Sequence, residues 1–208
     1  MAENRIVKAA LTGSIAMGKS TVAQMFRDAN VPVFDADAAV HQLYARHGEA
    51  VEPVGAVFPD VIKQGAIDRG QLARHVLQDA AAMAKLESIV HPLVRQQQEE
   101  FLESAVRAGH RVAVFDIPLL FETGRSDEFD VILVVSAPAE VQTARALERP
   151  DMTQEKLDAI LARQVPDADK RARATHIVST GVPLEDTRRQ VLAIITELQS
   201  LAGEQSHA

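Results

Sequence analysis

Eight consecutive residues near the N-terminus decide how the chain is organised: Gly13-Ser14-Ile15-Ala16-Met17-Gly18-Lys19-Ser20. They fit the pattern of a phosphate-binding loop, with glycines at both ends of the turn and a Lys-Ser pair after it. Arg5 to Thr12 before the loop has the composition of a buried strand, and Lys19 to Ala29 after it has a helical pattern. The alternative is a chance match in an ordinary turn, but the strand and helix around the loop favour a nucleotide site.

The residue types of the loop suit polyphosphate binding. Backbone amides and the positive end of the following helix surround phosphate oxygens, and Lys19 reaches the outermost phosphates. The Ser20 hydroxyl is a predicted Mg²⁺ ligand. The predicted nucleotide-binding residues are therefore Gly13, Ser14, Ile15, Ala16, Met17, Gly18, Lys19, Ser20 and Thr21.

A second feature, an acidic residue at the end of a predicted strand, strengthens this prediction. The apolar run from Arg111 ends at Asp116, and folds with such a loop place a strand-end carboxylate near the metal ion. Aspartate is also a common turn former, so Asp116 becomes informative only together with the loop. We therefore predict Ser20 and Asp116 as the metal ligands.

The alternation of strands and helices predicts an α/β fold. Near-continuous apolar runs are typical of parallel strands that helices cover on both faces, which gives three layers. The five predicted strands are Arg5 to Thr12, Val31 to Asp35, Arg111 to Asp116, Val131 to Ser136 and His176 to Ser179. Crossover helices are expected at Lys19 to Ala29, Pro138 to Leu147 and Leu184 to Leu201.

Two insertions interrupt this pattern. The interval from about 38 to 109 is too long for a simple crossover and predicts a helical subdomain, expected to bind the phosphoryl acceptor, within the single domain 1–208. Within it, Pro92 predicts a kink or a fresh helix start near His91. The polar insertion at about 148–173 is rich in Arg, Asp and Gln and is interpreted as a lid.

Composition excludes several classes of protein. The 22 basic and 29 acidic residues give a net charge of -7, which argues against broad binding to nucleic acid or an anionic membrane. The absence of cysteine excludes disulfides and thiolate metal sites. No apolar run predicts a membrane span and the first residues lack a secretory signal, so a cytoplasmic location is expected. The oligomeric state stays open.

Several further motifs are spread along the chain. They are Leu11-Thr12-Gly13, Asp35-Ala36-Asp37, Ile67-Asp68-Arg69, Leu86-Glu87 with His91-Pro92, and Asp116-Ile117-Pro118-Leu119-Leu120-Phe121-Glu122. A later basic segment is marked by the spacing of Arg145, Arg149, Gln164 and Lys170. Together these motifs resemble the dephospho-coenzyme A kinase family over most of the chain, from Ala10 to about Gln190, and the motif that ends at Glu122 is especially specific.

The sequence departs from the family pattern at a few positions. Ser14, Ala16 and Met17 stand where the family often has Gly, Gly and Ser, and Ile160 stands where arginine is common. After the fifth strand the family usually has Asp-Asn before its glycine, whereas this chain has Ser179-Thr180-Gly181. The residues that read adenine are therefore left open.

The resemblance implies a P-loop NTPase fold and a specific reaction. It implies Mg²⁺-dependent transfer of the ATP γ phosphoryl to the ribose 3'-hydroxyl of dephospho-coenzyme A, the final step of coenzyme A biosynthesis. Lys19 supplies charge to the transferring group. Asp37 is the predicted general base, because it follows a strand end where ligands gather. Asp35 is expected either to orient the acceptor hydroxyl or to support Asp37, and its structural alternative is an ordinary strand-end residue. The local alternative is that Asp37 only caps a helix beginning near Ala38.

Other candidate residues have plain structural alternatives. His91, Phe121 and Glu122 are predicted acceptor contacts, although His91 could end a helix and Phe121 could belong to the core. Arg145 and Arg149, and less strongly Arg163, are predicted to neutralise ATP phosphates, although solvated helix faces also carry arginines.

Two other functions remain open. A different small-molecule kinase would share the loop and lid, but the Asp35-Ala36-Asp37 and Pro118 to Glu122 motifs argue against it. A nucleotide-dependent binding switch is the second alternative. The chain lacks an Asn-Lys-x-Asp segment that reads guanine, and its arginine-rich insertion fits lid closure better.

Overall fold

The computed structural model describes residues 6–204 and divides into two compact units. The first unit comprises the described residues up to Phe34 and those from Ala105 onward, and the second spans Asp35–Ser104. The second unit overlaps the insertion predicted at about 38–109. Its role in acceptor binding stays a prediction.

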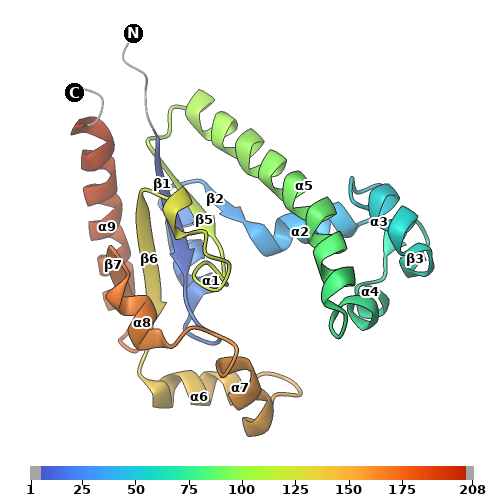
Figure 1. Cartoon of the computed structure of the whole chain (residues 1–208). Coiled ribbons are helices and arrows are strands. Elements are labelled where there is room, and N and C mark those ends of the chain that lie inside the picture. The colour runs from blue at the N-terminus through green and yellow to red at the C-terminus, as the bar shows by residue number, and fades with distance from the viewer. Residues whose placement is uncertain (1–5, 205–208) are drawn as a thin grey trace. The chain divides into compact units, whose positions relative to one another are not determined.

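The first unit is built on a five-stranded sheet in the order β2-β5-β1-β6-β7 (Figure 1). The central strand β1 pairs in parallel with β5 and β6, and β6 pairs in parallel with β7. These strands are β1 Val7–Thr12, β2 Val33–Asp35, β5 Val112–Asp116, β6 Val131–Ser136 and β7 His176–Ser179. The prediction of an α/β fold with a five-stranded parallel sheet is confirmed. Arg5, where the first strand was expected to begin, lies outside the described residues.

Helices and a short 3-10 turn complete the first unit. They are α1 Lys19–Asp28, η2 Ser126–Glu128, α6 Ala139–Leu147, α7 Gln154–Leu161, α8 Asp167–Ala172 and α9 Leu184–Glu204. Helices α1 and α9 contact each other, and α9 also contacts β1, β5 and β7. Phe26 of α1 and Leu198 of α9 are almost fully buried in the same core as Leu11 and Leu133 of the strands. This core fixes α1, and with it the loop that precedes the helix.

The second unit is mainly helical, with one small hairpin. Its elements are α2 Ala36–Tyr44, α3 Val51–Val57, η1 Pro59–Val61, β3 Ile62–Lys63, β4 Ala66–Ile67, α4 Arg69–Val76 and most of α5 Ala80–Arg107. The hairpin turns at Gln64 and Gly65, which both have positive φ, as in the tight turns that join short antiparallel strands. Asp68 then caps α4 by accepting a hydrogen bond from Gln71 N.

Helix α5 runs through Pro92 without a break, so the predicted fresh start near His91 is wrong. Leu86, Val90 and Val94 are buried at helical spacing on both sides of the proline. His91 and Pro92 themselves are exposed. The burial of this apolar stripe therefore favours one continuous helix, although Pro92 cannot donate the backbone hydrogen bond that its position would normally make.

No helix within residues 6–204 is long and apolar enough to cross a membrane.

Candidate active site

The phosphate-binding loop connects β1 to α1 in the first unit, as predicted. Gly18 precedes α1 with φ of 87°, a left-handed conformation that glycine adopts without steric cost. A Cβ atom on Gly13 would lie 2.6 Å from the Val135 carbonyl oxygen of β6, so the chain passes too close to that strand for a side chain. Gly13 is thus required by the close approach of the loop to β6, and Gly18 by the left-handed conformation before α1.

Lys19 and Asp116 form an ion pair at the carboxyl edge of the sheet. Lys19 is the first residue of α1, and its Nζ donates a hydrogen bond to Asp116 Oδ1. Asp116 ends β5 and is 5% exposed. Ser20 and Thr21 follow on the exposed first turn of α1. The structure therefore brings together the loop lysine and the strand-end carboxylate that the sequence singled out separately.

Ala16 is unusual for a residue with a side chain. Its φ is 61°, in the left-handed region, where a Cβ atom is unfavourable. Its methyl group is buried in a small apolar cluster with Ala146 of α6 and Leu157 of α7. The position where the family often has glycine thus packs against the helices that flank and form the predicted lid.

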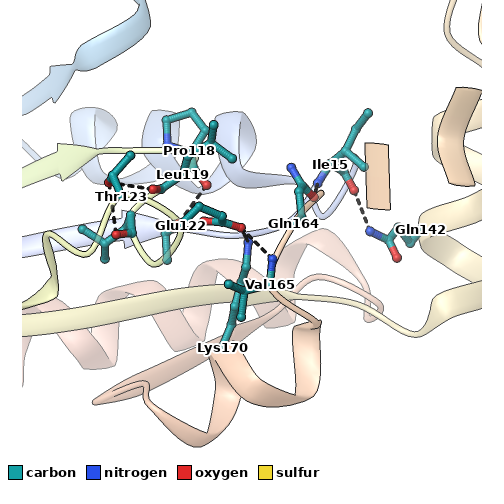
Figure 2. A network of polar contacts seen from close by, with 11 residues as sticks. Ile15, Pro118, Leu119, Glu122, Thr123, Gln142, Gln164, Val165 and Lys170 are labelled. Atoms are coloured by element: carbon teal, nitrogen blue, oxygen red, sulfur yellow. Dashed lines mark hydrogen bonds and ion pairs between the residues drawn. The ribbon is translucent and has the colours of Figure 1, made fainter. Parts of the chain in front are cut away.

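The backbone amide and the backbone carbonyl of Ile15 in the loop are each hydrogen-bonded to a glutamine side chain (Figure 2). Ile15 N donates to Gln164 Oε1 at 3.1 Å, and Gln164 lies between α7 and α8. The Ile15 carbonyl accepts from Gln142 Nε2 of α6 at 2.8 Å. Neither glutamine was predicted as a site residue. The only signal in the sequence was the family spacing of Gln164, because a glutamine on a predicted helix usually faces solvent.

Arg145 and Thr180 connect α6 to the other end of the loop. Arg145 donates from Nη1 to Thr180 Oγ1 at 3.0 Å and from Nη2 to the Thr180 carbonyl at 2.7 Å. Thr180 Oγ1 in turn donates to the Met17 carbonyl at 2.6 Å. Arg145 thus lies beside the loop, whereas Arg149 and Arg163 are exposed. Their contacts with ATP stay predictions.

Thr180→Val should destabilise the protein while keeping the side-chain shape. The variant loses the hydroxyl that donates to the Met17 carbonyl and accepts from Arg145, at a position that is 6% exposed. Leaving buried polar groups without a partner costs about 1 to 3 kcal/mol. Thr180→Ser, which keeps the hydroxyl, is the matched control. Chemical denaturation measures both, and equal midpoints for the valine and serine variants would contradict a role for these bonds.

Phe121 and Glu122 contact the predicted lid. Phe121 is 6% exposed, and the Arg173 guanidinium lies 4.4 Å from the centre of its ring. Glu122 Oε1 lies 2.9 Å from Lys170 Nζ and accepts a hydrogen bond from Val165 N at 2.9 Å. Burial raises the pKa of the Glu122 carboxyl, but Lys170 and the Val165 amide outweigh burial and hold that pKa below its usual value. Acceptor binding by Phe121 and Glu122 stays a prediction.

The second unit carries the other predicted site residues. Asp35 caps α2, because its Oδ1 accepts from Ala38 N at 2.9 Å. The alternative in which Asp37 caps a helix beginning near Ala38 is wrong, since α2 begins at Ala36 and Asp37 lies in its first turn. Asp37 is exposed, which leaves its carboxylate accessible. His91 is exposed on α5, and its contact with the acceptor stays a prediction.

Comparison with known proteins gives a consistent result. The family model of dephospho-CoA kinase matches residues 7–185. Dephospho-CoA kinase of Mesorhizobium japonicum is 54% identical over 193 residues, covering 93% of this chain and 97% of the relative. That of Brucella melitensis is 50% identical over 188 residues, covering 90% and 93%.

Solved structures share the fold over almost the whole chain. A protein of Thermus thermophilus has 34% identity and a TM-score of 0.80, with 93% of this chain and 98% of that chain covered. Dephospho-CoA kinase from Campylobacter jejuni has 24% identity and a TM-score of 0.71, with 93% and 97% covered. The phosphate loop, its lysine–aspartate pair and these matches together show that the chain belongs to the dephospho-CoA kinase family.

Proposed function

We propose that the protein transfers the γ phosphoryl of ATP to the ribose 3'-hydroxyl of dephospho-coenzyme A, giving coenzyme A and ADP. The observation that carries the proposal is the match to the dephospho-CoA kinase family across residues 7–185. The ion pair between Lys19 and Asp116 at the mouth of the loop supports phosphoryl transfer as the type of chemistry.

The loop binds the nucleotide phosphates in this proposal. The loop amides other than that of Ile15, which donates to Gln164, and the N-terminus of α1 provide donors and a positive field for an anion. Lys19 exchanges its contact with Asp116 for the β and γ phosphate oxygens of ATP. Its charge then stabilises the negative charge on the transferring group, where preorganised charge has the largest effect.

The residues beside Lys19 fit a magnesium ion. Ser20 supplies a hydroxyl and Asp116 a carboxylate, which are the hard oxygen ligands that Mg²⁺ prefers. Within residues 6–204, no three His, Cys, Asp or Glu side chains gather into a site that could hold a metal alone. Mg²⁺ usually binds through one or two protein oxygens plus substrate phosphates, and it would neutralise phosphate charge here.

Asp37 accepts the proton of the attacking hydroxyl in this proposal. Its carboxylate is exposed in the first turn of α2, directly after the end of β2. Asp35 is engaged as the cap of that helix, so it fixes the turn that carries Asp37. His91, Phe121 and Glu122 are proposed to help bind the acceptor, and the cytoplasmic location expected from the sequence stays a prediction.

The segment 148–173 is proposed to close over ATP and bring Arg149 to the phosphates, next to Arg145, which already lies beside the loop on α6. Hydrogen exchange in this segment should slow when ATP, Mg²⁺ and dephospho-coenzyme A bind, because closure excludes water. Helix α9, which packs in the core of the first unit and carries none of the predicted site residues, serves as an internal reference for exchange in the same experiment. Slow exchange that ligands leave unchanged would contradict the lid.

One experiment separates the candidate functions. The protein is incubated with ATP and Mg²⁺ and, in parallel, with dephospho-coenzyme A, AMP, adenosine or shikimate, followed by mass analysis. Only dephospho-coenzyme A should gain a phosphoryl group. Phosphorylation of another acceptor would favour a different kinase, and ATP hydrolysis that no acceptor accelerates would favour a binding switch.

A further inference from the structure

The two peptide groups that flank Ile15 are hydrogen-bonded to side chains from two different segments. The Ile15 amide is bonded to Gln164 and the Ile15 carbonyl to Gln142. Gln142 belongs to α6 and is 7% exposed, so it is a fixed part of the first unit. Gln164 instead lies in the short connection from α7 to α8, within the segment proposed as the lid. One of the two bonds therefore joins the loop to the lid segment.

The connection that carries Gln164 is itself anchored. The next residue, Val165, donates its amide to Glu122 Oε1 at 2.9 Å, and the same oxygen lies 2.9 Å from Lys170 Nζ (Figure 2). Lys170 is fully buried in α8, and Glu122 ends the motif that starts at the metal-site candidate Asp116. The Gln164 side chain is thus presented to the loop by two neighbours, Glu122 and Lys170, that restrain the chain beside it.

The bonded peptide lies at a sensitive point of the loop. Ala16 follows directly with φ of 61°, and its methyl group packs against Leu157 of α7. The amides after Ile15 are among those proposed to face the nucleotide phosphates. A rotation of the Ile15 peptide would turn these donors away, and misplacement of reacting groups by about 1 Å can lower a rate up to about 10²-fold.

We propose that Gln164 is a positioning residue that couples the lid to the phosphate loop. Its Oε1 atom holds the Ile15 amide, so the loop has its phosphate-binding shape when the base of the lid is in place. Movement of the lid then changes the donors around ATP, and ATP bound in the loop favours the closed lid. This proposal rests on the lid and nucleotide site proposed above.

The test replaces Gln164 by Met, which has similar length but no strong acceptor, and by Glu, which keeps an acceptor oxygen. Gln154→Met is the matched control, because Gln154 lies in the same insertion and its amide bonds to the exposed Asp158 of the same helix. Turnover of dephospho-coenzyme A, KM for each substrate, melting temperature and hydrogen exchange are measured on the full chain.

Gln164→Met should lower kcat about tenfold and leave KM for dephospho-coenzyme A within about twofold. Exchange of the Ile15 amide should speed up, and the slowing of exchange that ATP causes over 148–173 should be lost. Gln164→Glu should restore most of kcat, with KM for ATP raised by the added negative charge. Gln154→Met should match the unmodified protein throughout.

Unchanged kcat and unchanged ligand-dependent exchange in folded Gln164→Met would overturn the coupling, even if the melting temperature fell. If Gln164→Met does not fold, the coupling is tested by hydrogen exchange in the unmodified protein. Exchange of the Ile15 amide must then slow together with the lid segment when ATP binds, and independent behaviour would also overturn the proposal. Failure of the unmodified protein to phosphorylate dephospho-coenzyme A would instead contradict the proposed function.

Discussion

Lys19→Met should reduce phosphoryl transfer about 10³-fold while the protein stays folded. Removing one preorganised group that stabilises transition-state charge usually costs about 10² to 10³ in kcat. Lys19 is expected at the upper end because it carries a full charge next to the transferring group. Methionine preserves the length of the side chain in a position that is only partly exposed.

Single-turnover kinetics measures the effect on the chemical step, and thermal denaturation measures folding. Lys63→Met is the control, since Lys63 also forms an ion pair with an aspartate, Asp68, but in the hairpin of the second unit. Some loss of stability is expected in Lys19→Met, because Asp116 is buried and loses this partner. Turnover near that of the unmodified protein in folded Lys19→Met would remove the loop lysine from the mechanism.

Asp37→Asn should lose about 10²-fold or more in single-turnover rate at near-native stability. An amide cannot accept the ribose proton as a carboxylate does, and general-base catalysis typically contributes 10² to 10⁴. Stability should change little, because Asp37 is exposed and Asp35, not Asp37, caps α2. ATP affinity is measured separately, since removing a negative charge can tighten ground-state binding.

Asp35 offers the matched comparison for Asp37. Asp35→Ala removes the acceptor for Ala38 N and should cost about 0.5 to 2 kcal/mol, whereas Asp35→Asn should keep the cap. Full phosphoryl transfer by Asp37→Asn would show that Asp37 is not the base. A pronounced loss of stability in Asp37→Asn would point to a structural role instead.

The sequence predicted the first unit well because its signals are local and strong. The apolar runs of β1, β5 and β6 need burial on both faces, and the loop pattern fixes the order of strand, turn and helix. The ion pair of Lys19 with Asp116 follows from the parallel pairing of β1 with β5, which brings Leu11 opposite Asp116. The sequence did not predict this ion pair, but predicting the strands and the loop needed only the period of hydrophobic residues and one motif.

The missed features depend on contacts between distant residues or on very short elements. The β3–β4 hairpin has two residues in each strand, too few to show an alternating pattern. Helix α5 continues through Pro92 because Leu86, Val90 and Val94 are buried on one side of it. The local backbone preference at Pro92, from which the sequence prediction was made, gives no information on this burial. The hydrogen bonds to Ile15 join residues far apart in the sequence, 127 positions for Gln142 and 149 for Gln164. No local sequence pattern predicts such contacts.

The position of the new phosphate tests the central claim most directly. The protein, ATP, Mg²⁺ and dephospho-coenzyme A are allowed to react to completion, and phosphorus–proton correlation NMR assigns the product. The account predicts one new phosphate on the ribose 3' carbon, formed in equal amount with ADP. A phosphate at any other position, or ADP formed without a phosphorylated acceptor, would contradict it.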